Sequence, residues 1–323
     1  MGQLVDGEWK SGDVATTKDG GFERQDSTFR NWVTKNGSAG PSGEGGFPAA
    51  PDRYHLYVSH ACPWAHRTMV MRQLKGLADI ISVSVVHWHM GDKGWSFDDD
   101  VDGATGDDLY GKALLHEIYQ KADPDATCKV TVPVLWDKER QTIVSNESSE
   151  IIRMLNSAFA EWASDDTDYY PVDLKSEIDT VNDLVYPNVN NGVYRAGFAK
   201  NQEKYEAAYD DLFGALDELE ERLASNRYVV GDRFTEADIR LFTTLIRFDA
   251  VYHYHFKCNR NRLNEMPNLS GFMREIYQMP GIAETVHLDH IKGHYYTSHP
   301  GVNPTGVVPK GPALDFDAPH GRG

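Results

Sequence analysis

A cysteine followed by a proline is the strongest chemical signal in the sequence. Residues 59–67 read SHACPWAHR, and Cys62 lies where an expected strand gives way to an expected helix. Proline suits the first turn of a helix, because the N–H that it lacks would have been unpaired there. Cys62 would therefore lie at the helix start, where unpaired N–H groups and the helix dipole favour a thiolate. The sequence thus predicts a nucleophilic thiol at neutral pH.

The fourth position of this motif indicates how the thiol would work. A dithiol redox motif would have a second cysteine there, but the chain has Ala65, so no neighbour can resolve a mixed disulfide. The resolving thiol must be external, and glutathione is the simplest candidate, which implies two-step exchange through an enzyme-bound mixed disulfide. The alternative is that Cys62 is only a small buried residue, as many cysteines are.

Two later segments could bind such a thiol. In residues 131–134 (TVPV), Pro133 belongs at the start or edge of a strand, a setting that invites a cis bond. Residues 145–150 (SNESSE) precede an expected helix, so they can be read as an N-cap with acidic first-turn residues. They can also be read as a binding site for the γ-glutamyl end of glutathione, with Glu147 facing its ammonium group. We expect both roles together.

The elements around these motifs predict an α/β domain. Apolar periodicity gives the order βαβαββα, which is the thioredoxin-like arrangement. The expected strands are residues 54–59, 80–86, 130–136 and 141–144, and the expected helices are residues 65–74, 109–122 and 147–155.

The rest of the chain predicts an all-helical domain after a long arm. We place an extended N-terminal arm at residues 1–51, a thioredoxin-like domain at 52–160, a helical domain at 161–299 and a Pro/Gly-rich tail at 300–323. The expected helices of the second domain are residues 174–186, 201–224, 235–249 and 269–277, the third with a capping box from Thr235 to Asp238. The aromatic and charged residues of the arm suggest that it packs on the body of the protein; they are Phe22, Phe29, Arg30 and Trp32.

Composition excludes several classes of partner. The formal net charge of −17 would repel a phosphate backbone, so we expect no nucleic-acid partner. No apolar run approaches a membrane span, and the first residues lack a secretory core, so we expect a cytoplasmic protein with no membrane contact. Three cysteines are too few for a disulfide framework in 323 residues, and we interpret Cys128 and Cys258 as packing residues.

Two pairs of histidines raise the question of a metal. His87 and His89 form one pair, and His253 and His255 form the other. On a strand this spacing would place both rings on one face, but neither pair has a third ligand placed beside it. We therefore expect no metal site.

Several motifs together resemble the Xi class of glutathione transferases, the glutathionyl-hydroquinone reductases. They span nearly the whole chain: GPSGEGGF in the arm, SHACPWAHR, HWHMGDKGW, TVPVLWD, NESSEI, NGVYRAGFA and the late HYY. Omega-class transferases share the Cys-Pro start but lack the long arm and the C-terminal extension. The resemblance implies a thioredoxin-like domain joined to a helical transferase domain, glutathione as co-substrate, and a homodimer.

The resemblance also implies roles for particular residues. Cys62 matches the nucleophile, and Tyr194 matches a tyrosine that transfers a proton. Tyr252 and Tyr295 match two tyrosines implicated in lowering the pKa of the cysteine. The positions that match glutathione-binding residues are Trp95, Lys129, Val130, Thr131, Val132, Glu147 and Ser148. Taken alone, tyrosines on helices usually fill cores, so only the resemblance gives these three a role.

The implied reaction is reduction of a glutathionyl-hydroquinone to the hydroquinone. Cys62 would take the glutathionyl group as a mixed disulfide, and a second glutathione would release it as GSSG. Two alternatives remain open. An Omega-like thioltransferase or dehydroascorbate reductase would use Cys62 in the same way on other substrates, and a non-catalytic scaffold would need no reactive thiol.

Overall fold

The computed structural model describes residues 2–12 and 14–323 and divides the chain into two compact units. Unit 1 holds residues 1–13 and 25–167, and unit 2 holds residues 14–24 and 168–323. The N-terminal arm therefore contributes to both units. Each unit has its own buried apolar core.

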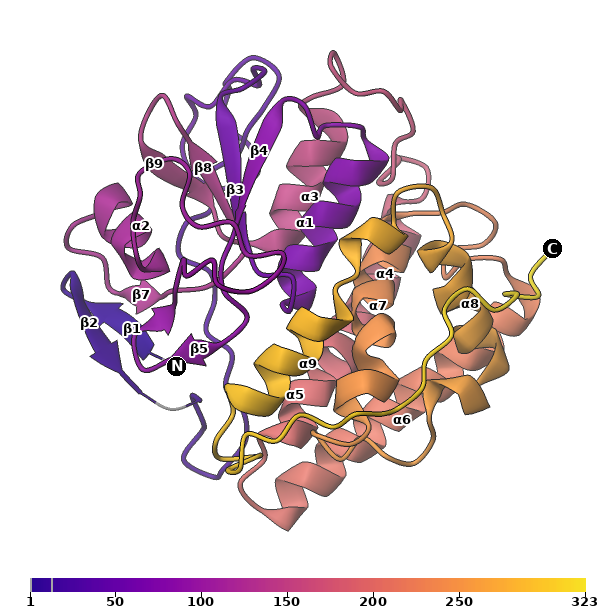
Figure 1. The fold of residues 1–323 in the computed structure, drawn as a ribbon. Coiled ribbons are helices and arrows are strands. Elements are labelled where there is room, and N and C mark those ends of the chain that lie inside the picture. The colour runs from indigo at the N-terminus through magenta and orange to yellow at the C-terminus, as the bar shows by residue number, and fades with distance from the viewer. Residues whose placement is uncertain (1, 13) are drawn as a thin grey trace. The chain divides into compact units, whose positions relative to one another are not determined.

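Unit 1 is built on a four-stranded mixed sheet in the order β4-β3-β8-β9 (Figure 1). Its strands are β3 (Tyr54–Val58), β4 (Ile81–Val85), β8 (Val134–Asp137) and β9 (Thr142–Ser145). Strands β3 and β4 are parallel, whereas β8 is antiparallel to both β3 and β9. Every residue of β3 is buried, as expected of a central strand. This pattern confirms the predicted thioredoxin-like topology.

Three helices complete this part of unit 1. Helices α1 (Pro63–Leu74) and α3 (Ser148–Ser157) lie side by side in Figure 1, and α2 (Leu115–Ala122) lies apart from them. The predicted start of the helix at residue 109 is wrong by six residues. The Asp107 carboxylate accepts hydrogen bonds from the backbone N–H groups of Leu109 and Lys112, and Gly111 has a φ of 61°, so a turn and a short irregular segment precede the helix instead.

Short strands extend unit 1 beyond the predicted elements. Strands β1 (Gly2–Val5) and β2 (Glu8–Ser11) form a hairpin, and β1 pairs on its other side with β7 (Cys128–Lys129). Strands β5 (Met90–Gly91) and β6 (Gly94–Trp95) form a second small hairpin. The predicted strand at residues 130–136 is correct only from Val134 onward, because the cis bond between Val132 and Pro133 separates β7 from β8.

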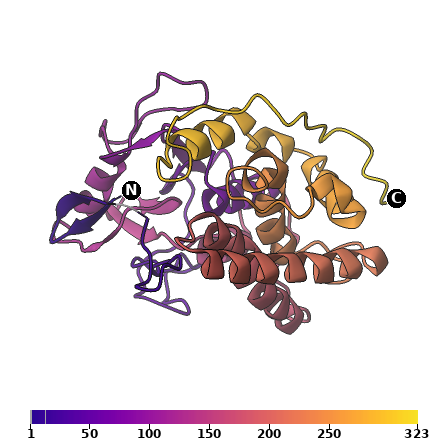
Figure 2. The ribbon, with the colours of Figure 1, turned by 90° about the horizontal axis from the view of Figure 1, so that it is seen from below.

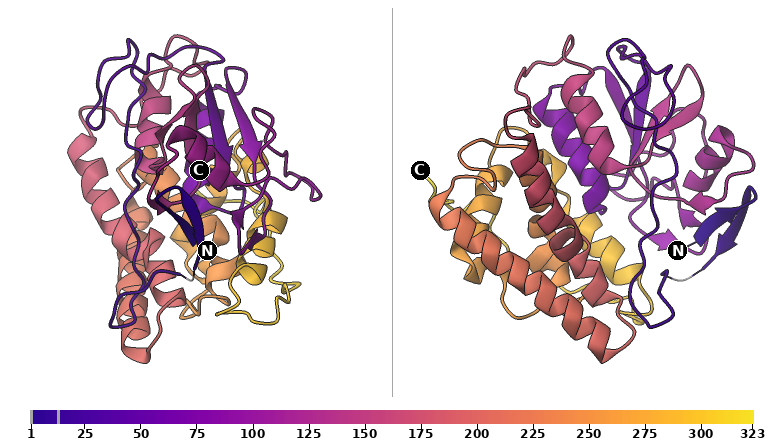
Figure 3. Two further views of the ribbon diagram at one scale, coloured as in Figure 1. Left: turned by 90° about the vertical axis from the view of Figure 1, so that its left-hand side faces the viewer. Right: turned by 180° about the vertical axis from the view of Figure 1, so that it is seen from behind.

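The arm returns to unit 1 at residue 25 and runs along it as a chain without helices, drawn in indigo in Figure 3. The backbone N–H of Asn31 donates to the carbonyl of Val144, and that of Asn146 donates to the carbonyl of Phe29. The segment thus pairs with the end of β9. This contact agrees with the expectation that the arm packs on the body of the protein.

Unit 2 is helical. Its α-helices are α4 (Lys175–Val185), α5 (Gly192–Gly197), α6 (Gln202–Ser225), α7 (Glu236–Arg247), α8 (Pro267–Tyr277) and α9 (Leu288–Thr297). Single π-helical turns, η1 (Tyr186–Asn190) and η2 (Phe248–Tyr252), follow α4 and α7, and two 3₁₀ turns are η3 (Leu263–Glu265) and η4 (Ala283–Thr285). The long helix α6 is prominent in Figure 2. Helices α5 and α9 were not predicted from the sequence.

The capping box predicted at the start of α7 is present. The Asp238 carboxylate accepts from the backbone N–H of Thr235 at 2.7 Å and from its hydroxyl at 3.0 Å. It also accepts from the N–H of Val229 at 2.9 Å. One buried carboxylate therefore fixes both the helix start and the turn before it.

Among the described residues, no helix combines the length and the apolar character that a membrane crossing requires.

Candidate active site

Cys62 is the N-cap residue of α1, with extended backbone angles (φ −78°, ψ 121°), and Pro63 opens the helix. The Cys62 carbonyl accepts from the N–H of His66 at 3.0 Å, which is the first hydrogen bond of the helix. The thiol is partly exposed, and its Sγ lies 3.6 Å from the carbonyl oxygen of Val132, to which it donates. The helix start and the segment before the cis bond therefore meet at this sulfur.

The segment that faces the thiol is held by the hydroxyl of Tyr119. This hydroxyl donates to the carbonyl of Thr131 at 2.8 Å and accepts from the N–H of the same residue at 3.2 Å. It also accepts from the Asn146 side-chain amide at 3.1 Å. Burial raises the pKa of Tyr119 to about 12, so the hydroxyl keeps its proton at neutral pH. Sequence reasoning missed Tyr119, because only the packing of α2 brings it to residue 131.

Glu147 is the N-cap residue of α3, and both oxygens of its carboxylate accept hydrogen bonds. Oε1 accepts from the N–H and the hydroxyl of Ser149 at 3.0 and 2.8 Å, and Oε2 accepts from the hydroxyl of Ser27 at 3.1 Å. Burial alone would raise the pKa of this carboxyl, but these hydrogen bonds and the charge of Arg67 together hold it below its usual value. Arg67 also donates to the Ser148 hydroxyl at 3.4 Å. The start of α3 thus carries an ionised carboxylate beside a hydroxyl.

The remaining predicted binding positions of unit 1 lie on the short strands β6 and β7 and in the segment that follows β7. Trp95 is buried in β6 and pairs with Met90 across the hairpin. Lys129 is half-buried in β7, where burial lowers the pKa of its ammonium group. Val130 and Val132 are buried on either side of Thr131.

The three tyrosines singled out from the sequence come together in unit 2. The hydroxyl of Tyr295 lies 2.5 Å from that of Tyr194 and 2.9 Å from that of Tyr252. Burial raises the pKa of Tyr252 and of Tyr295 well above the usual value for a phenol, so both remain protonated at neutral pH. The helices α5 and α9 and the π-helical turn η2 supply one phenol each. The result is a short chain of phenols.

Residues of the arm cover the ring of Tyr194. Phe22 stacks on it with ring centroids 6.1 Å apart, and the Arg24 guanidinium lies 5.1 Å from its centroid. Arg24 is oriented by a 2.6 Å hydrogen bond from its Nε to the side chain of Asn191. Sequence reasoning identified Phe22 as a packing residue but gave Arg24 no role.

The other cysteines and the histidine pairs have different surroundings. Burial raises the pKa of Cys128 and of Cys258, and neither forms a disulfide. His255 Nε2 lies 3.1 Å from His299 Nδ1 within a cluster of aromatic rings. Across residues 2–12 and 14–323, no group of three His, Cys, Asp or Glu side chains is arranged to hold a metal ion.

Two family models match this chain. Residues 61–158 match the N-terminal domain of glutathione S-transferases, and residues 202–275 match their C-terminal domain. The first match contains Cys62, the cis bond and Glu147, and the second contains Tyr252.

Curated relatives and solved structures match over nearly the whole length. The glutathionyl-hydroquinone reductase YqjG of Escherichia coli is 56% identical over 100% of this chain and 98% of its own, and the reductase PcpF of Sphingobium chlorophenolicum is 50% identical over 97% of each. The glutathione-bound structure of YqjG has a TM-score of 0.93 at 55% identity and 99% coverage of both chains. A Xi-class transferase from Natrialba magadii has a TM-score of 0.92 at 52% identity, over 100% of this chain and 96% of its own. The chain therefore belongs to the Xi class of glutathione transferases, the family of the glutathionyl-hydroquinone reductases.

Proposed function

We propose that this protein is a glutathione-dependent reductase of glutathionyl-hydroquinones. The observation that carries the proposal is the placement of Cys62 at the start of α1, with its Sγ 3.6 Å from the carbonyl that precedes the cis bond. A thiol at a helix start is favoured as a thiolate, which is the nucleophilic form. The close relatives named as reductases of this kind match the whole chain.

The glutathionyl group binds in unit 1. The ionised carboxylate of Glu147 pairs with the ammonium of the γ-glutamyl end, and the hydroxyl of Ser148 contacts its carboxylate. The backbone beside the cis bond, at Val132, pairs with the cysteinyl part. The other residues of this site are Trp95, Lys129, Val130 and Thr131.

The reaction proceeds in two steps. The Cys62 thiolate attacks the sulfur of the glutathionyl thioether, an S–S bond forms, and the C–S bond breaks. The ring carbon leaves with the electron pair and takes a proton, giving the hydroquinone. A second glutathione then attacks the glutathionyl sulfur as its thiolate, which releases GSSG and returns Cys62 to the thiolate. Overall the ring carbon gains two electrons, and the two glutathione sulfurs, one from the thioether and one from the second glutathione thiol, are oxidised to the disulfide of GSSG.

Tyr194 is the proton donor in this proposal. Its hydroxyl is hydrogen-bonded to that of Tyr295, which in turn is hydrogen-bonded to that of Tyr252. Because burial keeps both partners protonated, the chain of phenols can replace the proton that Tyr194 gives up. A general disulfide reductase would not require this arrangement.

The test uses glutathionyl-menadiol with excess glutathione. We expect wild type to release menadiol and GSSG in equal amounts, Cys62→Ala to be inactive, and Tyr194→Phe to be slowed by ~10²-fold or more. Cys128→Ala is the matched control, since it removes a buried thiol of unit 1 that has no role in the reaction. If wild type does not reduce glutathionyl-menadiol but reduces simple mixed disulfides, the proposal is wrong and the protein is an Omega-like thioltransferase. If wild type is inert on both substrates, the transferase-fold scaffold replaces the proposal.

We also propose that the protein is a cytoplasmic homodimer. The reaction consumes reduced glutathione, which is abundant where thiols are kept reduced. Two-fold dimers are the commonest soluble assemblies. Sedimentation at micromolar protein should show a dimer, and a monomer at that concentration would contradict the second part of the proposal.

A further inference from the structure

We infer that the arm residues of unit 1 form part of the framework of the glutathione site, with Trp9 and Ser27 as positioning residues. The inference rests on the proposed function, because it concerns the binding positions assigned there. Those positions lie on three separate segments of unit 1: the β5–β6 hairpin, β7 with the residues after it, and the start of α3. Each of the three segments is held by a different part of the arm.

The first contact is between Trp9 and the hairpin that carries Trp95. The indole Nε1 of Trp9 donates to the carbonyl of Asp92 at 2.9 Å. The same ring lies against Gly94, where an added Cβ would come within 2.8 Å of it, and Gly94 has a φ of 82°. The indole also stacks on His116 with centroids 5.0 Å apart. Trp9 thus contacts both α2 and the residue that precedes Trp95.

The second contact is the pairing of β1 with β7. Gln3 and Leu4 pair with Lys129 and Cys128, and the Leu4 side chain is fully buried. Strand β7 is only two residues long and has β1 as its paired neighbour in the sheet. Its pairing therefore comes from the arm, and β7 leads directly into the segment that faces the Cys62 thiol.

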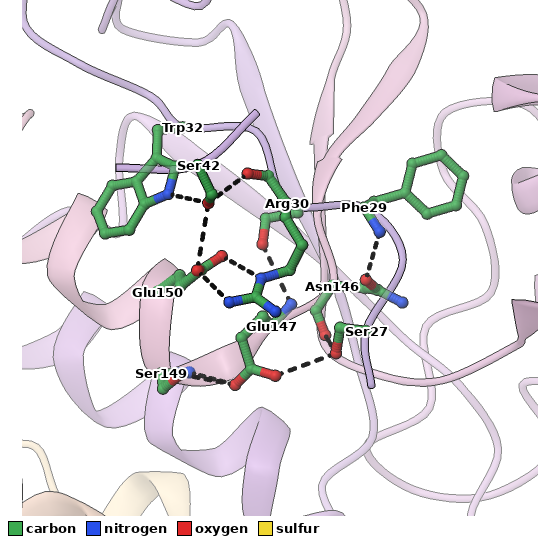
Figure 4. A network of polar contacts seen from close by, with 10 residues as sticks. Ser27, Phe29, Arg30, Trp32, Ser42, Asn146, Glu147, Ser149 and Glu150 are labelled. Atoms are coloured by element: carbon green, nitrogen blue, oxygen red, sulfur yellow. Dashed lines mark hydrogen bonds and ion pairs between the residues drawn. The ribbon is translucent and has the colours of Figure 1, made fainter. Parts of the chain in front are cut away.

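The third contact is at the start of α3 and is drawn in Figure 4. The Ser27 hydroxyl donates to Glu147 Oε2 at 3.1 Å, and the N–H of Phe29 donates to the Asn146 side chain at 3.1 Å. One turn further along, Arg30 binds the Glu150 carboxylate with two hydrogen bonds, the one from its Nε being 2.8 Å long. The arm therefore fixes both the direction of the Glu147 carboxylate and the backbone around it.

These contacts share one consequence. The Glu147 carboxylate is held by its hydrogen-bond donors, and the hairpin that carries Trp95 is held by Trp9. Groups that are already fixed lose less conformational entropy when a ligand binds than mobile groups do, so the site is pre-organised. Trp9 and Ser27 lie behind the binding residues in this proposal and act through them. Removing either contact should weaken glutathione binding more than it slows the chemical step.

The experiment measures the Kd of glutathione for the full-length protein by calorimetry, together with KM and kcat on glutathionyl-menadiol. We expect Trp9→Ala and Ser27→Ala each to raise the Kd and the KM for glutathione by about tenfold, equivalent to ~1.4 kcal/mol, with kcat within about twofold of wild type. Trp9→Phe keeps a ring against Gly94 but loses the donor to Asp92, so its effect should be smaller. Ser27→Thr keeps a hydroxyl and should recover most of the binding.

Matched controls and a double-mutant cycle separate positioning from general loss of stability. Ser38→Ala changes an exposed serine of the same arm, and Trp162→Phe changes a half-exposed tryptophan of unit 1; neither should alter the Kd. In a Glu147→Gln background, Ser27→Ala should cause little further loss, because the contact that it removes is already weakened. Wild-type Kd values in both Trp9→Ala and Ser27→Ala, or full additivity in the cycle, would overturn the inference. Since binding is measured without a hydroquinone, a protein that binds glutathione but leaves glutathionyl-menadiol intact would contradict the proposed function alone.

Discussion

At the scale of single residues, one hydroxyl links three parts of the candidate site. The Tyr119 hydroxyl satisfies both backbone groups of Thr131 and one N–H of the Asn146 amide. Phe29 makes an edge-to-face contact with the same ring, so the arm also contacts Tyr119. A phenol in this position does no chemistry itself, yet it sets the path of the backbone that faces Cys62.

Tyr119→Phe should therefore destabilise the protein and weaken glutathione binding together. The change leaves a part-buried N–H and a part-buried carbonyl of Thr131 without this partner, which costs ~1 kcal/mol or more. Urea unfolding and the KM for glutathione measure the two effects. Tyr205→Phe is the control, because it removes a 2.7 Å hydrogen bond to Lys257 at a more exposed tyrosine. Equal losses in the two variants would contradict the prediction.

Site residues that belong to a local sequence motif could be predicted from the sequence. Cys62 and Glu147 were found because each sits next to a helix start that the sequence marks with a proline or with acidic residues. Tyr119, Ser27 and Trp9 could not be found in this way. The partners of Trp9 and Ser27 are 83 and 120 residues away, and Tyr119 meets Thr131 and Asn146 only when the chain folds.

At the scale of elements, the helices and strands with strong apolar periodicity were predicted and the others were not. Helix α9 was not predicted because its buried residues are mostly histidines and tyrosines, such as His290 and Tyr295, with Ile291 as a buried aliphatic residue among them. The β1–β2 hairpin was not predicted either, although the sequence contains a turn pattern that indicates it. Asp6 and Gly7 stand between the two strands with φ values of 48° and 74°, which is the Asp-Gly pattern of a tight hairpin turn.

The Asp238 cap is the element-scale feature with the largest expected effect on stability. Its carboxylate accepts from the N–H groups of Val229 and Thr235, and all three residues are buried. Asp238→Ala would leave both donors unpaired, so we expect a loss of at least ~2 kcal/mol in the free energy of unfolding. Asp289→Ala is the control, since Asp289 lies exposed in the first turn of α9. A loss under ~1 kcal/mol at Asp238 would show that water replaces the cap.

At the scale of the whole molecule, the described parts of the arm and of the tail are both attached to folded structure. The arm contributes strands to unit 1 and ring contacts to unit 2, and the last residues of the tail are attached within unit 2. There the Arg322 guanidinium donates to the buried Glu275 carboxylate at 2.8 Å and to the carbonyl of Asn226 at 3.2 Å. The tail has no regular structure, so its attachment depends on a few such contacts.

Arg322→Ala should therefore release the tail while leaving the rest of unit 2 folded. Glu275 keeps a 2.7 Å contact with Arg227, so the carboxylate is not left alone. We expect protease cleavage within residues 300–321 to become about tenfold faster, with catalytic activity retained. Arg233→Ala, which removes an exposed ion pair with Asp173, is the control and should leave the cleavage rate unchanged. Unchanged cleavage in Arg322→Ala would show that the tail is attached by its other contacts.

The buried histidines of unit 2 make the stability of the molecule depend on pH. Burial lowers the pKa of His255 from 6.5 to about 4, so between these two values the unfolded chain binds a proton that the native state does not. The contribution of His255 to the free energy of unfolding is therefore fully present above pH 6.5 and is lost as the pH falls toward 4.

The measurement compares urea unfolding of wild type and His255→Phe across this range. Because the carboxylates titrate in both proteins, the difference between the two free energies reports on His255 together with its contact to His299. We expect the free energy of unfolding of wild type to fall relative to that of His255→Phe by up to ~1.4 kcal/mol for each pH unit between 6.5 and about 4. Tyr254→Phe changes the exposed neighbouring residue, and its free energy of unfolding should depend on pH in the same way as that of wild type. Parallel curves for His255→Phe and wild type would mean that His255 takes up its proton without unfolding the cluster in which it is buried.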